Sequence, residues 1–315
     1  MYTEGRDTEA DRPAHVRAAS SLAWIDHEVA LVQDDANFAA LVDPGPGTVR
    51  SIALPRGEGG LRQFDDARGN KKYKLDFEGC VAVPGTDGPL LLAFGSGSKR
   101  RRRRVLTIDR WQRDEPRIRV VDAKSLYERL EAEITFAGSD MNLEGALVVG
   151  RTLRFFGRGN GAARRNLRAL NATCDVSLDA LLEYLQDSEG IAPPEPTGVV
   201  QYTLGDLDGI ALGFTDATVF GESVLYSATA EASEDASEDG SVSGSVLGVI
   251  AASGGVRHTL VVDEHERPLR EKVEGVLLSR TSPTRVYIVI DADDATRPSE
   301  LCEVELRGPW RDDLS

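Results

Sequence analysis

Four short phrases in this 315-residue sequence each place an acidic side chain directly before a glycine. The acids are Glu78, Glu144, Asp208 and Glu274, and the glycines that follow them are Gly79, Gly145, Gly209 and Gly275. Successive phrases are 66, 64 and 66 residues apart. Carboxylates that met at about 6 Å would repel one another by about 3 kcal/mol per pair at an effective dielectric of about 20. Four such groups together need either bound protons or a bound cation.

The chemistry of these side chains indicates which cation would fit. Oxygen ligands without cysteine or histidine favour Ca²⁺, with Mg²⁺ or Mn²⁺ as alternatives. An earlier and diverged copy of the repeat carries a serine at the corresponding position. The predicted metal ligands are therefore Ser20, Glu78, Glu144, Asp208 and Glu274. The alternative is that these are solvated turn residues, which suits one acid-glycine pair better than four in register.

Cysteine and histidine offer no competing site. Cys80, Cys174 and Cys302 are widely separated, and the four histidines have neither metal-ligand nor triad spacing. A net charge of -15 disfavours nucleic acid and anionic membranes as partners. The polar N-terminal segment has no apolar signal core, and no run is long enough to span a membrane. We therefore expect a cytoplasmic protein with no membrane partner.

The residues around each phrase predict the elements that position it. An apolar run of four to six residues follows each acid, two more follow that run, and turn residues separate them. Short runs of this kind are typical of strands, and a unit of about 65 residues repeated along the chain is typical of a β-propeller. In a propeller the first strand of each blade lines the centre, so the acids would face one another. Two β-sandwiches with fortuitous spacing are the alternative.

The predicted fold class is all-β, a five-bladed β-propeller forming a single domain over residues 15–310. We expect residues 1–14 and 311–315 to be tails, the first of them flexible. The predicted blades span about 20–55, 75–122, 141–205, 206–263 and 271–306. Because the last blade runs out of sequence, residues 15–19 (HVRAA) are expected to add its fourth strand and close the ring.

Two short helices are predicted in the linkers between blades, with Asp122 and Ser177 as their N-caps. Two acidic segments stand apart from the repeat. We expect Glu231–Ser245 to be a disordered insertion. For Asp291–Asp294 (DADD) we favour a solvated turn over a cation site.

Two basic, glycine-containing loops are expected beside the acids, because the loop between the second and third strands of a blade opens on the same face. They run from Phe94 to Arg104 and from Phe156 to Arg168. Guanidinium groups and free backbone N–H groups recognise phosphate or carboxylate. The candidate catalytic residues are Arg100, Arg101, Arg158 and Arg165. The candidate ligand-binding residues are Gly95, Ser96, Gly97, Ser98, Lys99, Gly159 and Asn160. The alternative, equally weighted, is a pair of solvated hairpin tips whose arginines pair with acidic neighbours.

With these motifs, the sequence resembles the calcium-activated nucleotidases, also called apyrases. Ser20 matches the first-blade serine of that family, QDD (Gln33 to Asp35) follows it, and Glu78, Glu144 and Glu274 match the family's glutamates. Asp208 stands where the family has serine. The resemblance implies a five-bladed propeller with a central calcium held by serine and glutamate side chains. It covers most of the chain, but only weakly between the motifs, and it does not locate nucleotide-contacting residues.

These observations together predict a metal-centred propeller with an anion or phosphate site on one face. The leading hypothesis is a cation-dependent hydrolase of phosphate esters or anhydrides, acting on an anionic, phosphorylated small molecule. One alternative is a non-catalytic module that binds a ligand or a protein partner around a structural metal. Another is an esterase-like or lactonase-like hydrolase.

Overall fold

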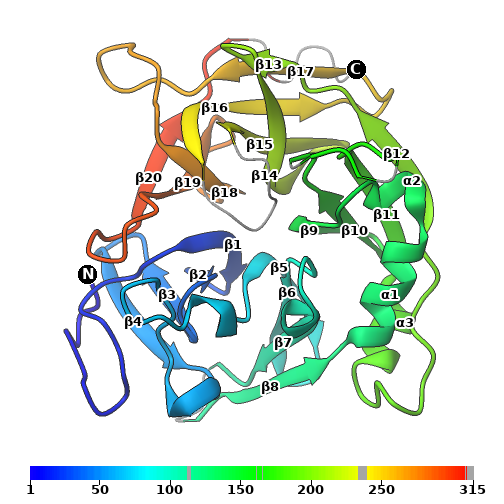
Figure 1. Ribbon diagram of the computed structural model, residues 1–315. Helices are drawn as coiled ribbons and strands as arrows, with labels where there is room; N and C mark the ends of the chain where they lie inside the picture. The colour runs from blue at the N-terminus through cyan, green and yellow to red at the C-terminus, as the bar shows by residue number, and fades with distance from the viewer. Residues whose placement is uncertain (112–114, 161, 165, 233–239, 309, 311–315) are drawn as a thin grey trace.

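The computed structural model describes residues 1–111, 115–160, 162–164, 166–232, 240–308 and 310. The chain forms five antiparallel sheets that follow one another in sequence and are arranged in a ring (Figure 1). The predicted five-bladed β-propeller is confirmed. Residues 112–114, part of the linker after the third strand of blade 2, lie outside the described residues, as does the segment 311–315 expected to be a tail.

Blades 1 to 3 each contain four strands in simple order. The strands of blade 1 are β1 (Ala19–Ile25), β2 (Glu28–Gln33), β3 (Phe38–Asp43) and β4 (Thr48–Ala53). Those of blade 2 are β5 (Phe77–Gly85), β6 (Gly88–Gly95), β7 (Arg104–Asp109) and β8 (Arg117–Asp122). Those of blade 3 are β9 (Leu143–Val149), β10 (Thr152–Gly157), β11 (Asn171–Ser177) and β12 (Thr197–Tyr202).

Blades 4 and 5 depart from this pattern in opposite directions. Blade 4 has five strands: β13 (Asp206–Leu207), β14 (Ile210–Phe220), β15 (Ser223–Ala232), β16 (Ser241–Ile250) and β17 (Val256–Leu260). Blade 5 has three: β18 (Lys272–Leu278), β19 (Arg285–Asp291) and β20 (Glu300–Glu305). The extra strand β13 has two residues and pairs with the start of β14. It matters for the site because it adds a turn ahead of the inner strand of blade 4.

Five apolar clusters form the core, one between each pair of neighbouring blades. Strand β6 shows why the sequence folds this way. Leu92 and Phe94 face the cluster shared with blade 3, whereas Leu91 and Ala93 face the cluster shared with blade 1. Side chains of a strand alternate between its two faces, so a fully apolar run fits a strand that has a neighbouring blade on each side.

Short helices lie before blade 3, as predicted for a linker, and also within it, between β11 and β12, where a linker between blades was predicted. They are α1 (Lys124–Ala132), α2 (Ile134–Ala137) and α3 (Leu178–Tyr184), and 3-10 turns lie at Glu58–Gly60, Lys71–Tyr73 and Arg100–Arg102. The Ser177 hydroxyl accepts a hydrogen bond from the Ala180 N–H and caps α3 as predicted. Asp122 lies one residue before the N-cap of α1 and accepts from the Lys124 N–H. Within the described part of the chain, no helix combines the length and apolar character needed to cross a bilayer.

The ring closes differently from the prediction. Residues 15–18 form no strand, and blade 5 keeps three strands. A single backbone hydrogen bond, from the Ser299 N–H to the Val16 carbonyl, marks the place where the fourth strand was expected. The ends of the ring are instead joined through the apolar cluster between blades 5 and 1, which contains Val16, Leu22 and Val289.

The first residues also differ from the prediction of a flexible tail. Tyr2 is buried in the cluster between blades 5 and 1, and its hydroxyl accepts a hydrogen bond from Gln33 Nε2 at 2.9 Å. The Thr3 N–H bonds to the Val49 carbonyl of β4 at 2.7 Å. This segment therefore runs along blade 1, and Met1 lines a groove together with Leu301 and Glu303 of blade 5 without forming a strand there.

Candidate functional site

The innermost strands, β1, β5, β9, β14 and β18, surround the centre of the ring (Figure 1). The pairing of each with its neighbour skips one residue, which is a β-bulge. The five skipped residues are Ser20, Glu78, Glu144, Thr215 and Glu274. A bulge re-aims a side chain, so the same position in every blade is directed at the same end of the propeller, which we call the mouth. Four of the five predicted ring residues are thus structurally equivalent.

Asp208 is not the fifth of them, and that prediction is wrong. Asp208 lies in the turn between β13 and β14, with φ of 55°, and its side chain is exposed. Gly209 is in the same turn, with φ of 80°, and no atom lies within 4 Å of the position of an added Cβ. The turn between β13 and β14 therefore repeats the acid-glycine phrase by coincidence. The position equivalent to the ring glutamates lies seven residues later, at Thr215.

The glycines that follow the three ring glutamates let neighbouring inner strands approach closely. A Cβ on Gly79 would lie 2.9 Å from the carbonyl carbon of Gly145, and one on Gly145 would lie 3.2 Å from Cα of Asp216. Neighbouring inner strands therefore approach so closely that only glycine fits between them. Gly275 is similarly crowded, by Leu22 of blade 1.

The two hydroxyl positions of the ring connect blades. Ser20 Oγ donates a hydrogen bond to the Phe77 carbonyl of blade 2. Thr215 Oγ1 donates to the Val273 carbonyl of blade 5 at 2.7 Å. Each hydroxyl thus bonds to the residue just before the ring glutamate of the next blade, which fixes where that glutamate starts.

One residue further along its strand, Asp216 crosses the centre of the ring. Its Oδ2 accepts hydrogen bonds from Ser21 Oγ of blade 1 and from the Val276 N–H of blade 5, both at 3.1 Å. Blades 1 and 4 are not neighbours, so this contact spans the channel. Burial raises the pKa of Asp216 well above its usual range.

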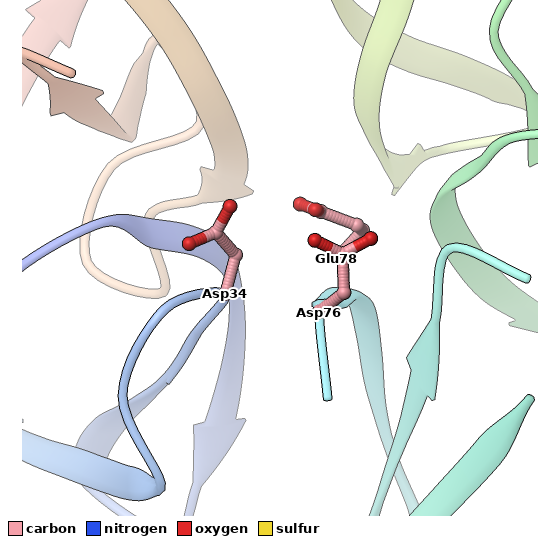
Figure 2. Close-up of side chains that lie close together, drawn as sticks. All are labelled: Asp34, Asp76 and Glu78. Carbon is pink, nitrogen blue, oxygen red and sulfur yellow. The ribbon is translucent and has the colours of Figure 1, made fainter. Parts of the chain in front are cut away.

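Three carboxylates converge at the mouth beside blades 1 and 2. Asp34 directly follows β2, Asp76 directly precedes β5, and Glu78 is the bulge residue of β5. Their ligand oxygens lie within 4.8 Å of one another, and Figure 2 shows Asp34 facing the other two across the gap between the blades. Within the described part of the chain, these three side chains form a group whose oxygens are close enough together to hold a metal ion.

Two buried cations accompany these carboxylates. Lys74 Nζ lies 2.6 Å from Asp34 Oδ2 and 2.6 Å from Asp76 Oδ1, and Arg102 Nη1 lies 2.8 Å from Asp76 Oδ2. Although burial opposes it, these cations lower the pKa of Asp76, and the carboxylates hold the pKa of Lys74 well above its usual value. We call Asp34, Lys74, Asp76, Glu78 and Arg102 the blade 1/2 cluster.

Glu78 differs from the rest of this cluster. Burial raises its pKa well above the usual range, and the nearby Asp76 and Asp34 charges raise it further. Among the described residues, its carboxyl group makes no hydrogen bond and no ion pair. The oxygens of the Glu78 carboxyl group can therefore accept a further ligand at the mouth.

A second cluster gathers beside blades 3, 4 and 5, and we call it the blade 3–5 cluster. Arg158 Nη2 lies 2.6 Å from Glu231 Oε2, and Arg158 Nη1 lies 3.5 Å from Glu144 Oε1. Lys272 Nζ lies 2.6 Å from Glu274 Oε1 and 3.6 Å from Glu231 Oε2. All five side chains are buried. Burial raises the pKa of Glu144 to about 8 despite the Arg158 charge, so this carboxyl group carries a proton near neutral pH.

The buried lysines and arginines of the two clusters offset the repulsion that was expected among the carboxylates. The expectation was a set of carboxylates with no protein counter-charge. Each cluster instead holds three acids against two cations, and at least one acid in each has a raised pKa. One acceptor is still unsatisfied in the second cluster, because Glu274 Oε2 is buried without a hydrogen-bond partner.

The predicted basic rim is largely neutralised. Arg101 pairs with Glu58, Arg103 with Glu131 and Arg104 with Asp122. Arg158 is not on the rim at all but in the blade 3–5 cluster. Arg100 and Lys99 are exposed, and Arg165 lies outside the described residues. Most of these arginines therefore follow the alternative given above, in which they pair with acidic neighbours.

The small residues of the rim have structural partners. Ser96 Oγ bonds to Asp76 and to Ser98 Oγ, and Ser98 Oγ accepts from Arg102. A Cβ on Gly95 would collide with the Arg102 carbonyl, and one on Gly97 would meet the Tyr127 ring at 2.5 Å. The Gly159 N–H donates to Asn171 Oδ1, and Asn160 Oδ1 lies 3.4 Å from Asn142 Nδ2. The loop shapes the blade 1/2 cluster and offers no row of free donors.

An acidic pocket of about 310 Å³ opens beside the blade 1/2 cluster, between blades 1 and 5. Its acidic lining residues are Asp34, Asp35, Asp65, Asp66, Asp291, Asp293 and Asp294, and its basic ones are Lys71 and Lys74. Burial and the Asp34 charge raise the pKa of Asp291 to about 6. The DADD segment, for which a solvated turn was favoured, thus contributes to a wall of this pocket. A surface of this kind favours cations over anions.

Comparison with known proteins places the chain in a family. Residues 15–306 match a family described as "Family of unknown function (DUF6929)". The chain belongs to this family. Comparison with curated proteins finds no match.

Comparison with solved structures finds distant matches to this DUF6929 member, among them the following three. The WD40 repeats of RRP9 give a TM-score of 0.43 at 9% identity, covering 95% of this chain and 83% of that one. A luciferin-regenerating enzyme gives 0.41 at 10% identity, covering 94% and 78%. A GH43 protein from Bacillus licheniformis gives 0.47 at 10% identity, covering 95% and 54%. Identity this low says nothing about the ligand or activity of the DUF6929 chain.

Several site residues escaped the sequence analysis, although a signal for some of them exists. Asp76, Asn142 and Lys272 each lie two residues before a ring glutamate, and alternation along a strand puts such residues on the same face. Asn142 Nδ2 indeed donates to Glu144 Oε1 at 2.5 Å. Glu231 was assigned to a disordered insertion, but it belongs to β15, and only residues 233–239 of that segment lie outside the described residues.

Proposed function

We propose that this protein binds a divalent cation at the mouth, with Asp34, Asp76 and Glu78 as carboxylate ligands and Ca²⁺ as the first candidate. The observation that carries the proposal is the convergence of these oxygens within 4.8 Å, one of them on a Glu78 carboxyl group without a described partner. Carboxylates gathered this closely disfavour one another's charged forms, and a bound cation would offset that repulsion. An all-oxygen donor set suits Ca²⁺, which takes six to eight such ligands.

Two further features support the same proposal. Glu274 Oε2 is a buried acceptor without a hydrogen-bond partner. The fourth ring position is Thr215, a hydroxyl residue, which suits the resemblance to calcium-activated nucleotidases better than Asp208 did, since that family has serine there. The revised ring has three glutamates and two hydroxyls.

Lys74 would compete with a cation for two of the proposed ligands. Its ammonium group lies 2.6 Å from an oxygen of both Asp34 and Asp76, so an incoming cation competes with it for the same acceptors. The Arg102 contact keeps one Asp76 oxygen occupied. Affinity then depends on how far Glu78 and solvent offset the loss of the lysine contacts.

Calcium titration of two matched variants tests the proposal. Glu78→Gln keeps the shape of the side chain and removes its charge, and we expect it to weaken Ca²⁺ binding at least about 10-fold, as loss of a charged ligand should. Asp208→Asn makes the same chemical change in the exposed turn and should leave affinity within about twofold. Calorimetry on the chelator-treated protein gives both values. Equal effects of the two substitutions, or no binding to the wild type, would refute the site.

Hydrolysis is the second candidate function, because a cation bound by the blade 1/2 cluster would lie beside an open pocket of about 310 Å³. A bound divalent cation would polarise a phosphate or ester oxygen of a ligand. Glu144, protonated near neutral pH, is a possible proton donor. The aspartates of the pocket repel an anion, so a phosphorylated ligand depends on the cation and on Lys71 for its binding.

A chelator-controlled assay separates the hydrolase from a binding propeller. Nucleotides, phosphate monoesters, carboxylic esters and lactones are incubated with the protein in calcium and in excess chelator. We expect calcium-dependent turnover that Glu78→Gln abolishes and Asp208→Asn retains. Turnover that is absent from the whole panel would contradict the hydrolytic candidate and favour a ligand-binding or protein-binding propeller with a structural cation.

A further inference from the structure

Blade 5 is the one blade of the described chain that ends after its third strand. The corresponding outer strands of the other blades are β4, β8, β12 and β17. Strand β20 therefore forms the outer edge of its sheet, and Figure 1 shows it at the periphery of the ring with no strand beyond it. An open edge leaves backbone N–H and C=O groups without ladder partners.

Two hydrogen bonds show which groups point outward. Along an antiparallel edge strand, alternate residues direct both backbone groups towards the same side. The Leu306 N–H bonds inward, to the Thr284 carbonyl that precedes β19, and the Ser299 N–H bonds outward, to the Val16 carbonyl. By this alternation Leu301, Glu303 and Glu305 direct their backbone groups outward. No hydrogen bond in the described residues uses these outward groups.

The missing strand leaves a groove on each face of β20. One groove, of about 440 Å³, lies towards blade 1 and is lined by Leu31, Val49, Tyr287, Val289 and Leu301 among others. The other, of about 640 Å³, has Ile288, Ile290, Cys302 and Val304 on its floor. A strand added to β20 would place alternate side chains in the two grooves. Val16 already occupies the first position of that strand.

Charge indicates what kind of segment fits. Strand β20 carries Glu300, Glu303 and Glu305 and no basic residue. The lining of the larger groove is acidic on balance, because its acids outnumber its two arginines, Arg267 and Arg297. Glu303 pairs with Arg285 and Glu305 with Arg307, both at 3.0 Å, but these pairs are exposed and can exchange partners. Pairing with a second copy of β20 would bring like charges together. A basic segment would complement them.

We propose that the open edge of β20 is a docking site for an extended, basic segment of a partner protein, which completes blade 5 as its fourth strand. Main-chain hydrogen bonds to Leu301, Glu303 and Glu305 would supply the register, and the two grooves would take its alternate side chains. This site lies on the outer edge of blade 5 and does not depend on a bound cation.

Fluorescence anisotropy with a labelled nine-residue peptide of alternating lysine and valine tests the proposal. A second peptide of identical charge carries N-methyl groups on alternate residues, which remove the N–H donors of one edge. We expect the first peptide to bind and the methylated peptide to bind at least about 10-fold more weakly, since each lost hydrogen bond reduces affinity. Equal binding of the two, or no binding of either up to about 1 mM, would overturn the proposal.

Two substitutions at one position separate backbone pairing from charge. Glu303→Pro removes an outward N–H, which an edge strand tolerates, and Glu303→Gln removes only the charge. Glu303→Pro should weaken peptide binding at least about 10-fold and Glu303→Gln about two- to threefold, with the melting temperature confirming that each is folded. Equal effects of the two would overturn the proposal. So would a concentration-dependent dimer that Glu303→Pro abolishes, since the edge would then serve a second copy.

Discussion

The two halves of the mouth use the same strand position in different ways. In the blade 1/2 cluster the bulge residue Glu78 has no described partner and joins Asp34 and Asp76 around a common point. In the blade 3–5 cluster Glu144 and Glu274 are each held by an internal cation, Arg158 or Lys272. Both clusters contain three acids and two cations, so the charge count alone does not distinguish them. In the blade 1/2 cluster the three acids surround one common point. In the blade 3–5 cluster the acids are linked one after another through Arg158 and Lys272.

Removing the lysine of each cluster should break this comparison most strongly. Lys74→Met and Lys272→Met each leave three acids against a single buried cation, and breaking a buried ion pair typically lowers the free energy of unfolding by about 3–5 kcal/mol. Calcium should restore most of the loss in Lys74→Met, because the converging oxygens can accept it, and little in Lys272→Met. Denaturant unfolding with and without calcium measures both effects.

Lys124→Met, at an exposed helix pair with Glu128, serves as the control and should change stability by less than about 0.5 kcal/mol. Equal rescue of Lys74→Met and Lys272→Met by calcium would show that the two clusters are equivalent and would remove the basis for placing the cation beside blades 1 and 2.

The pH dependence of stability sharpens the comparison next. The pKa of Glu144 is about 8 in the folded protein and about 4.3 in an unfolded chain. Between these values the folded state binds more protons than the unfolded state, so stability falls as pH rises, by up to about 1.4 kcal/mol per pH unit for this group. Glu144→Gln cannot ionise and should flatten that slope. Melting temperatures from pH 5 to pH 8.5 test this, and parallel curves for the two proteins would contradict it.

The smallest effect is expected at the basic rim. Arg101 pairs with Glu58 at 3.3 Å, with both side chains about half exposed, and stacks over Tyr73. Arg101→Ala should lower the free energy of unfolding by no more than about 1 kcal/mol and leave calcium binding unchanged. A large loss of affinity for a phosphorylated ligand in this variant would contradict this expectation and would show that the basic rim is part of the binding site.

The sequence sufficed for the fold because the repeat is local. Each blade is a run of neighbouring strands, so spacing and alternation alone indicated five blades. The position of Asp208 could not be read the same way, because the two-residue strand β13 reproduces an acid-glycine turn before the true bulge at Thr215. Nothing in the composition of that phrase separates a hairpin turn from an inner strand.

The counter-charges were the other part that the sequence left hidden. Arg158 stands in the sequence beside ordinary strand residues, and only the meeting of blades brings it to Glu231. Lys74, in contrast, lies two residues before Asp76, which it contacts. Glu231 reaches Arg158 across 73 positions. Lys272 had a local signal, since it precedes Glu274 by two residues, whereas the contacts between Arg158 and Glu231 depend on how blade 3 packs on blade 4.

Asp216 has a consequence for traffic through the molecule. Its carboxyl group links non-neighbouring blades one residue below the ring, so it forms a floor. If the proposed cation site is occupied, Asp216 lies across the channel behind it, so the ion would enter and leave on the side of Glu78.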